Sequence, residues 1–202
     1  MRGERVHATP INKRRRWNMK VKDVIILAAE EIGVADKVNG YLSQGSEEGE
    51  SIVKALLRCF NLVENELAID YFPLYVEDVV LTETGKIFYS ELTETPVRID
   101  LVTNSNGNRA LFTLFPDYIK LEKPDTYTIV YCYAPKKKEL EDDVSFQTTV
   151  SDRLLAMGIA AEYCAACGLY EEGAVWDEKY KDAIKAAHKN KPSRIMRTRR
   201  WV

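Results

Sequence analysis

The chain has 202 residues, of which 46% are hydrophobic and 30% charged, and its formal net charge is -2. This composition is typical of a folded globular domain and excludes a disordered chain. No apolar stretch approaches the roughly 20 residues that a membrane-spanning helix needs, so we expect no membrane contact. The two histidines, His7 and His188, lie near the chain ends, which excludes histidine-based catalytic triads and histidine-ligated metals from the body of the chain.

Charge is distributed unevenly along the chain. Residues 1–18 carry six Lys or Arg and one acid, and residues 185–202 carry seven Lys or Arg and no acid. The body between them, residues 19–184, has 16 basic and 30 acidic residues. An acidic body with basic ends is typical of a protein whose ends bind a partner. The alternative is that the basic ends only keep the chain in solution.

The basic stretch 13–18 directly precedes Met19. Arg can be encoded by AGG, and consecutive AGG codons spell a bacterial ribosome-binding signal just upstream of a start codon. An amphipathic helical pattern begins at once after Met19. We therefore expect Met19 to be the start and residues 1–18 to be a translated leader or a disordered arm. The alternative is a basic arm that binds nucleic acid.

Two helices are expected before the middle of the chain. Residues 21–32 have apolar side chains at helical spacing and end near Gly33. The polar Gly/Ser stretch 40–49 predicts a loop. A second helix is expected over 47–71, where Pro73 ends it.

Five of the seven prolines lie in residues 73–135, and polarity alternates along this part of the chain, so residues 75–135 predict a β-region. Residues 104–108 predict a turn between strands. About six short strands separated by tight turns indicate a small antiparallel sheet, sandwich or barrel. The expected strands are 76–82, 86–89, 97–101, 109–115, 118–121 and 127–133.

Two further helices are expected over 148–168 and 170–187, and their short connection predicts an antiparallel helical hairpin. Small residues form a stripe along the first of these helices, which would let a partner backbone approach closely. We expect this stripe to pack against a neighbouring subunit. Its members are Gly158, Ala161, Ala165 and Gly168.

These elements predict an α+β fold, in which N-terminal and C-terminal helices pack around a small antiparallel β-domain. Residues 19–188 form the single domain of this interpretation. Residues 189–202 are expected to form an extended basic C-terminal tail.

The four cysteines are too few for a disulfide framework in a chain of this length, so a reducing compartment is expected. Cys164 and Cys167 form a CxxC pair near the C-terminal end of a predicted helix, where the helix dipole disfavours a thiolate. Cys59 and Cys132 are isolated, which leaves a zinc site without enough ligands. We interpret the cysteines as small core residues.

An acidic cluster follows the β-region at Glu139, Glu141, Asp142 and Asp143. Carboxylates can hold a cation or act in acid–base catalysis, but a loop with no partners for them favours solvated side chains. Motifs for phosphate binding or for a nucleophile are missing from the sequence. We therefore expect no enzyme, no catalytic residue, no cofactor and no metal.

The basic tail is the most informative feature of the sequence. The planar arginine fork suits carboxylate or phosphate groups, and an exposed tryptophan is typical of an interface anchor. Both a protein partner and nucleic acid remain possible, and the interleaved Ile195 and Met196 favour a protein groove. The expected partner-binding residues are Arg194, Arg197, Arg199, Arg200 and Trp201.

The order of these elements resembles the head–tail connector proteins of tailed double-stranded DNA bacteriophages and prophages, also called adaptor, tail tubular or gateway proteins. The likeness covers residues 19–202 and lies in order and spacing. The stretches that carry it are 71–74, 115–119, 127–135, 150–163 and 199–201.

The resemblance implies a structural virion protein that forms a closed ring, dodecameric in the family, beneath the portal protein. The C-terminal tail would dock on the portal, a tail or stopper protein would follow, and genomic DNA would pass through the lumen without sequence-specific binding. The expected location is the virion neck, after assembly in the cytoplasm of the bacterial host. The alternatives are a nucleic-acid-binding protein that uses the basic tail and, third, a small enzyme with an unrecognised site.

Overall fold

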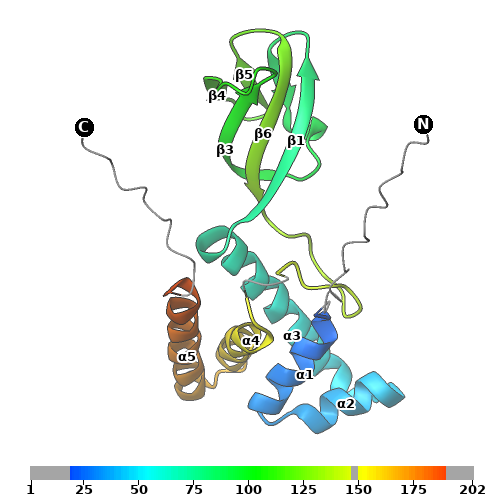
Figure 1. Ribbon diagram of the computed structural model, residues 1–202. Helices are drawn as coiled ribbons and strands as arrows, with labels where there is room; N and C mark the ends of the chain where they lie inside the picture. Colours follow the sequence, from blue (N-terminus) through cyan, green and yellow to red (C-terminus); the bar gives the residue numbers. More distant parts are fainter. Residues whose placement is uncertain (1–18, 147–149, 190–202) are drawn as a thin grey trace, which may run out of the picture.

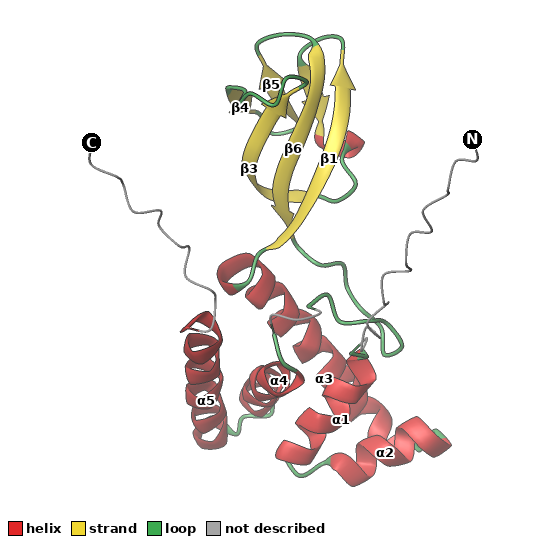
Figure 2. Cartoon of the chain, in the orientation of Figure 1, coloured by secondary structure: helices red, strands yellow, loops and turns green. Residues whose placement is uncertain are grey.

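The computed structural model of the protein describes residues 19–146 and 150–189. Its helices gather in one part of the molecule, the helical unit, and its strands form a second part, the β-unit, which projects from the end of α3 (Figures 1 and 2). The chain is therefore a mixed α+β protein, as predicted. The prediction that the helices pack around the β-domain is wrong, because in the described residues the helices and the strands form separate cores. The α-helices are α1 (Val21–Glu31), α2 (Ala35–Gln44), α3 (Glu47–Glu66), α4 (Asp152–Ala166) and α5 (Tyr170–Lys189).

The β-unit consists of two three-stranded antiparallel sheets, with strand orders β1–β6–β3 and β2–β5–β4. A small antiparallel sheet, sandwich or barrel was predicted for this region, and its antiparallel character is confirmed. A short 3-10 turn, η2 (Tyr89–Glu91), follows β2. The strands are β1 (Leu74–Thr82), β2 (Lys86–Phe88), β3 (Pro96–Asn104), β4 (Phe112–Leu114), β5 (Tyr118–Leu121) and β6 (Asp125–Tyr133).

The inner faces of the two sheets share one hydrophobic core. Alternation along strands such as β1 and β5 sends every second side chain inward, so that short strands suffice to enclose the core. Tyr131 is fully buried there, and its hydroxyl donates to the Asp78 carboxylate at 2.7 Å. The other fully buried members are Ile87, Val102, Ile119 and Ile129.

The helical unit has a separate core between α1, α3, α4 and the inner face of α5. The helix predicted over 47–71 is present as α3 and a π-helical turn, η1 (Leu67–Tyr71), that continues it. η1 packs against β6 and so joins the two units. The first helix ends where predicted, because Gly33 adopts a left-handed φ of 73°.

The loop predicted over 40–49 is wrong, because α2 occupies residues 40–44 and α3 begins at Glu47. Only Gly45 and Ser46 separate α2 from α3, and Gly45 ends α2 in the left-handed region, with φ 70°. Gly49 is buried against α2, and a Cβ there would collide with the carbonyl oxygen of Lys37. Gly49 therefore reflects close packing of the two helices, and Gly45 reflects the left-handed end of α2.

The predicted start of the third helix at 148 is also wrong, since α4 begins at Asp152. Ser151 has an extended backbone, and its hydroxyl accepts a hydrogen bond from the Leu154 amide at 3.2 Å. This N-cap fixes the start of the helix. After α4, the residues 167–169 lead directly into α5, which packs on α4.

Residues 134–146, here called the return segment, run from β6 back along α3 to the N-terminus of α1. The Asn61 side chain bonds both the amide and the carbonyl of Lys138, at 2.6 and 3.1 Å. The amides of Val21 and Lys22 donate to carbonyl oxygens of the segment at 3.1 and 3.0 Å. The return segment therefore supplies acceptors that the first turn of α1 lacks within its own helix.

Candidate functional site

The predicted portal-docking residues lie outside the described part of the chain: Arg194, Arg197, Arg199, Arg200 and Trp201. The described part of the chain that precedes them is the last turn of α5. There the ring of His188 stacks on Phe72 with a centroid distance of 4.8 Å and an interplanar angle of 15°. α5 thus carries the chain to the junction between η1 and β1.

Two of the four residues in the small-residue stripe, Gly158 and Ala161, are enclosed by the chain itself. A Cβ on Gly158 would lie 2.8 Å from a methyl carbon of Val63 and 2.9 Å from the Tyr180 ring. Ala161 is also buried, whereas Ala165 and Gly168 are exposed. Gly158 and Ala161 therefore serve packing of α4 against α3 and α5, and contact with another subunit stays a prediction only for Ala165 and Gly168.

Three cysteines are buried, as predicted, and all four are free thiols. Burial raises the pKa of Cys59 to about 11 and also raises the pKa of Cys164. These thiols are therefore protonated at neutral pH and poorly suited to redox chemistry. Cys167 is exposed at the C-cap of α4, so the prediction of a core position is wrong for this residue.

The acidic cluster of the return segment has partners, contrary to the prediction of purely solvated side chains. Asp143 pairs with Lys20 at 2.8 Å and Glu141 with Lys22 at 3.1 Å. The Asp142 carboxylate accepts from the Glu139 amide at 2.7 Å. These carboxylates lie beside the N-terminus of α1, where negative charge is favoured by the helix dipole. Their role is to hold the return segment against α1.

Across residues 19–146 and 150–189, His, Cys, Asp and Glu side chains do not gather in any set of three that could hold a metal ion. In the same ranges, every helix is too short or too polar to cross a bilayer.

The sheet β2–β5–β4 carries a cluster of exposed rings and lysines that we did not predict. Phe115 stacks on Tyr118 with a centroid distance of 4.7 Å and an interplanar angle of 6°, and Phe88 lies 5.8 Å from Tyr118. The Lys86 ammonium lies 5.0 Å from the centre of the Tyr118 ring. Lys120 alternates with the buried Ile119 and so shares the outer side of β5. We call Lys86, Phe88, Phe115, Tyr118 and Lys120 the aromatic–lysine face.

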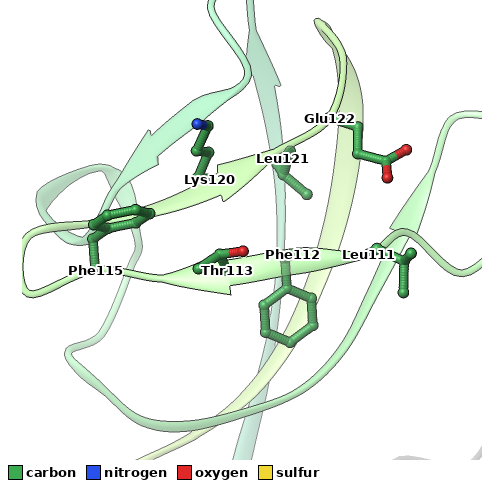
Figure 3. A pocket seen from close by; sticks show the side chains of 7 residues that line it. All are labelled: Leu111, Phe112, Thr113, Phe115, Lys120, Leu121 and Glu122. Atoms are coloured by element: carbon green, nitrogen blue, oxygen red, sulfur yellow. The ribbon is translucent and has the colours of Figure 1, made fainter.

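A shallow groove of about 390 Å³ adjoins this face along β4 and β5 (Figure 3). It shares Phe115 and Lys120 with the face, and Leu111 at its rim is 75% exposed. Phe112 and Leu121 close its floor toward the β-unit core. The groove is open and partly apolar, which suits a protein surface better than a small polar substrate.

The other sheet exposes a row of apolar side chains on its edge strand β1. Tyr75, Val79 and Leu81 alternate with half-buried residues along the strand, and Leu81 is 70% exposed. Exposed apolar side chains on an edge strand are typical of a surface that another protein covers.

The helical unit has its own exposed apolar surface at the start of α5. Tyr170 is 74% and Val175 53% exposed. Glu171 and Glu178 are exposed and, at three to four residues from Val175, lie on the same side of the helix. Lys179 is also four residues from Val175, and its ammonium lies 3.8 Å from the centre of the Trp176 ring. We call Glu171, Val175 and Glu178 the acidic face of α5.

Comparison with models of known protein families finds no match, and comparison with curated proteins finds none either.

Proposed function

We propose that the protein is a structural virion protein, a head–tail connector that forms a ring beneath the portal and joins the capsid to the tail. The observation that carries the proposal is that large apolar side chains are exposed on both units of the subunit, on β1, on the aromatic–lysine face and at the start of α5. A protein that works alone rarely leaves several such patches in water, whereas a subunit of an assembly needs them.

The charge of the body supports passage of DNA through such a ring. Residues 19–184 carry 30 acids against 16 basic residues, so the body as a whole repels the phosphate backbone. Repulsion disfavours the tight, salt-dependent binding that clusters of lysine and arginine produce. Genomic DNA would therefore slide past the ring without sequence-specific contacts.

Among the described residues, the carboxylates whose pKa is shifted bond to other groups of the protein and do not face an open cleft. Asp78 accepts hydrogen bonds from Thr93 and Tyr131 within the β-unit, and Glu64 accepts from Ser145 in the helical unit. We therefore propose a structural role and no enzymatic one.

The remaining partners follow from the connector role. The basic tail, with Arg194, Arg197, Arg199, Arg200 and Trp201, would dock on an acidic groove of the portal. A tail or stopper protein would bind the opposite side of the ring. The protein would assemble in the host cytoplasm and reside in the virion neck.

Electron microscopy of the protein mixed with its portal protein tests the proposal. We expect closed rings of this chain stacked coaxially on the portal ring. The protein alone is an insufficient sample, because a connector can remain monomeric until it meets the portal. A mixture in which the portal stays bare at saturating concentrations would overturn the proposal. Strong salt-dependent binding to DNA in place of portal binding would favour the alternative of a nucleic-acid-binding protein.

A further inference from the structure

We propose that the aromatic–lysine face of one copy docks on the acidic face of α5 of a second copy. This inference rests on the proposed ring and names the surfaces that build it. The partner that binds the face is a second copy of this chain, because the two surfaces of the molecule carry complementary charges.

The aromatic–lysine face is preorganised for a protein contact. The turn that carries its rings is fixed, because the Phe115 amide donates to the Tyr118 carbonyl at 2.9 Å and the Tyr89 hydroxyl donates to the Phe115 carbonyl at 2.8 Å. Phe88 nevertheless stays 45% exposed. Rigid exposed rings lose little conformational entropy on binding and are typical anchors of interfaces.

The acidic face of α5 offers the complementary chemistry. Glu171 and Glu178 have no ion pair among the described residues, whereas the nearby Asp182 and Asp177 are paired with Lys185 and Lys181. Val175 lies between the two free carboxylates and gives the face an apolar centre. Two carboxylates around an apolar residue match two lysines around exposed rings.

The two faces cannot meet within one chain. Figure 1 shows β4 and β5 at the end of the β-unit that is remote from the helices, whereas α5 lies in the helical unit. Contact between them therefore requires two molecules. A contact between two different surfaces is heterologous, and repetition of such a contact around an axis closes a ring.

DNA is a weaker occupant of the aromatic–lysine face than a second copy. The face presents two lysines, Lys86 and Lys120, which are paired across β2 and β5. A site for a phosphate backbone usually presents more cations than this.

Photo-crosslinking tests the contact directly. We place the photoreactive residue p-benzoylphenylalanine at position 115 of the full chain, irradiate it both free at high concentration and bound to the portal, and map the products by mass spectrometry. We expect crosslinks between copies that end in residues 170–182. The same probe at Leu62, which is 50% exposed on α3, is the matched control. Products that avoid 170–182, or that form with added DNA instead, would overturn the inference.

Charge reversal provides a second test. Lys86→Glu with Lys120→Glu, and separately Glu171→Lys with Glu178→Lys, should each reduce ring formation about tenfold, and the combination of all four in one chain should restore it. Lys123→Glu with Lys137→Glu changes the net charge equally outside the face and should have no effect. If rings form on the portal with all of these variants, the interface is refuted and the connector role stands. If the portal stays bare with the wild-type protein, the connector role itself is refuted.

Discussion

Glu64 is a carboxylate enclosed in the helical unit, where it joins α3 to the return segment. It is 1% exposed, and it accepts a hydrogen bond from the Ser145 amide at 2.7 Å. Burial raises the pKa of Glu64, and the hydrogen bond from Ser145 offsets this only in part. A carboxyl with a raised pKa holds its proton more tightly in the folded chain than in the unfolded one. Its contribution to the free energy of unfolding therefore falls as the pH rises from the ordinary value of 4.5 through the folded pKa.

Replacement of Glu64 by glutamine tests the direction of this pH dependence. Gln keeps an oxygen that accepts from the Ser145 amide and removes the charge, so at about pH 7 we expect Glu64→Gln to be at least as stable as the wild type. The difference should shrink toward about pH 4, where the wild-type carboxyl is protonated. Urea unfolding across this pH range measures the difference in stability and its change with pH. Glu64→Leu is the control: it leaves the Ser145 amide unpaired and should cost about 1–3 kcal/mol at every pH. A wild type more stable than Glu64→Gln at neutral pH would contradict the expectation.

At the scale of elements, glycines decide how closely the helices approach. Gly158 lies where α4 meets both α3 and α5, and the atoms nearest to its missing side chain are buried. The Tyr180 ring cannot easily move away, since its hydroxyl also bonds Glu66 at 3.3 Å. Gly173 on α5 faces α4 as well, but there a Cβ would have its nearest neighbours at 3.5 Å, an ordinary contact.

The pair of glycines gives a matched prediction. Gly158→Ala should destabilise the protein by about 1–3 kcal/mol, because the new methyl group overpacks the contact with Val63 and Tyr180. Gly173→Ala should be neutral or stabilise by about 0.5–1 kcal/mol, since alanine favours the helix. Thermal unfolding of the two variants measures the difference. Equal stabilities would show that the α4 contact relaxes freely.

Much of this element structure could be read from the sequence, because polarity periods and prolines are local signals. The strand prediction at 118–121 matched β5, and 86–89 matched β2 within one residue. α2 could not be predicted, because Gly49 of α3 is needed for the close approach of α2, and this tertiary contact has no local signal in the sequence. The start of α4 was missed for a local reason, the N-cap at Ser151, which the apolar pattern upstream concealed.

Of the two candidate surfaces, one could be predicted from the sequence and the other could not. The acidic face of α5 is visible in the sequence as spacing at 171, 175 and 178 along one helix. The aromatic–lysine face is not, because β2 and β5 are brought together by a strand register that pairs Lys86 with Lys120 and Phe88 with Tyr118. Nothing local to either segment specifies that pairing.

At the scale of the whole molecule, the two units are joined at a narrow region. β1 leaves η1 next to the end of β6, where Leu74 pairs with Tyr133, and η1 packs on β6. The last described turn of α5 reaches the same region through His188 and Phe72. The chain beyond residue 189 therefore starts beside the junction of the units. A tail that starts there can bind a partner while both units remain free to contact neighbouring copies.

Deletion of residues 192–202 tests the role of the tail. The described core ends before this segment, so we expect the truncated chain to unfold at the wild-type temperature in calorimetry, while its affinity for the portal falls at least about tenfold. Two full-length variants separate the contributions. Arginine-to-lysine changes at 194, 197, 199 and 200 keep the charge but lose the planar fork, and Trp201→Ala loses the anchor. Both should weaken portal binding without changing stability. Unchanged portal affinity after the deletion would refute docking by the tail, whereas loss of salt-dependent DNA binding with intact portal binding would assign the tail to nucleic acid.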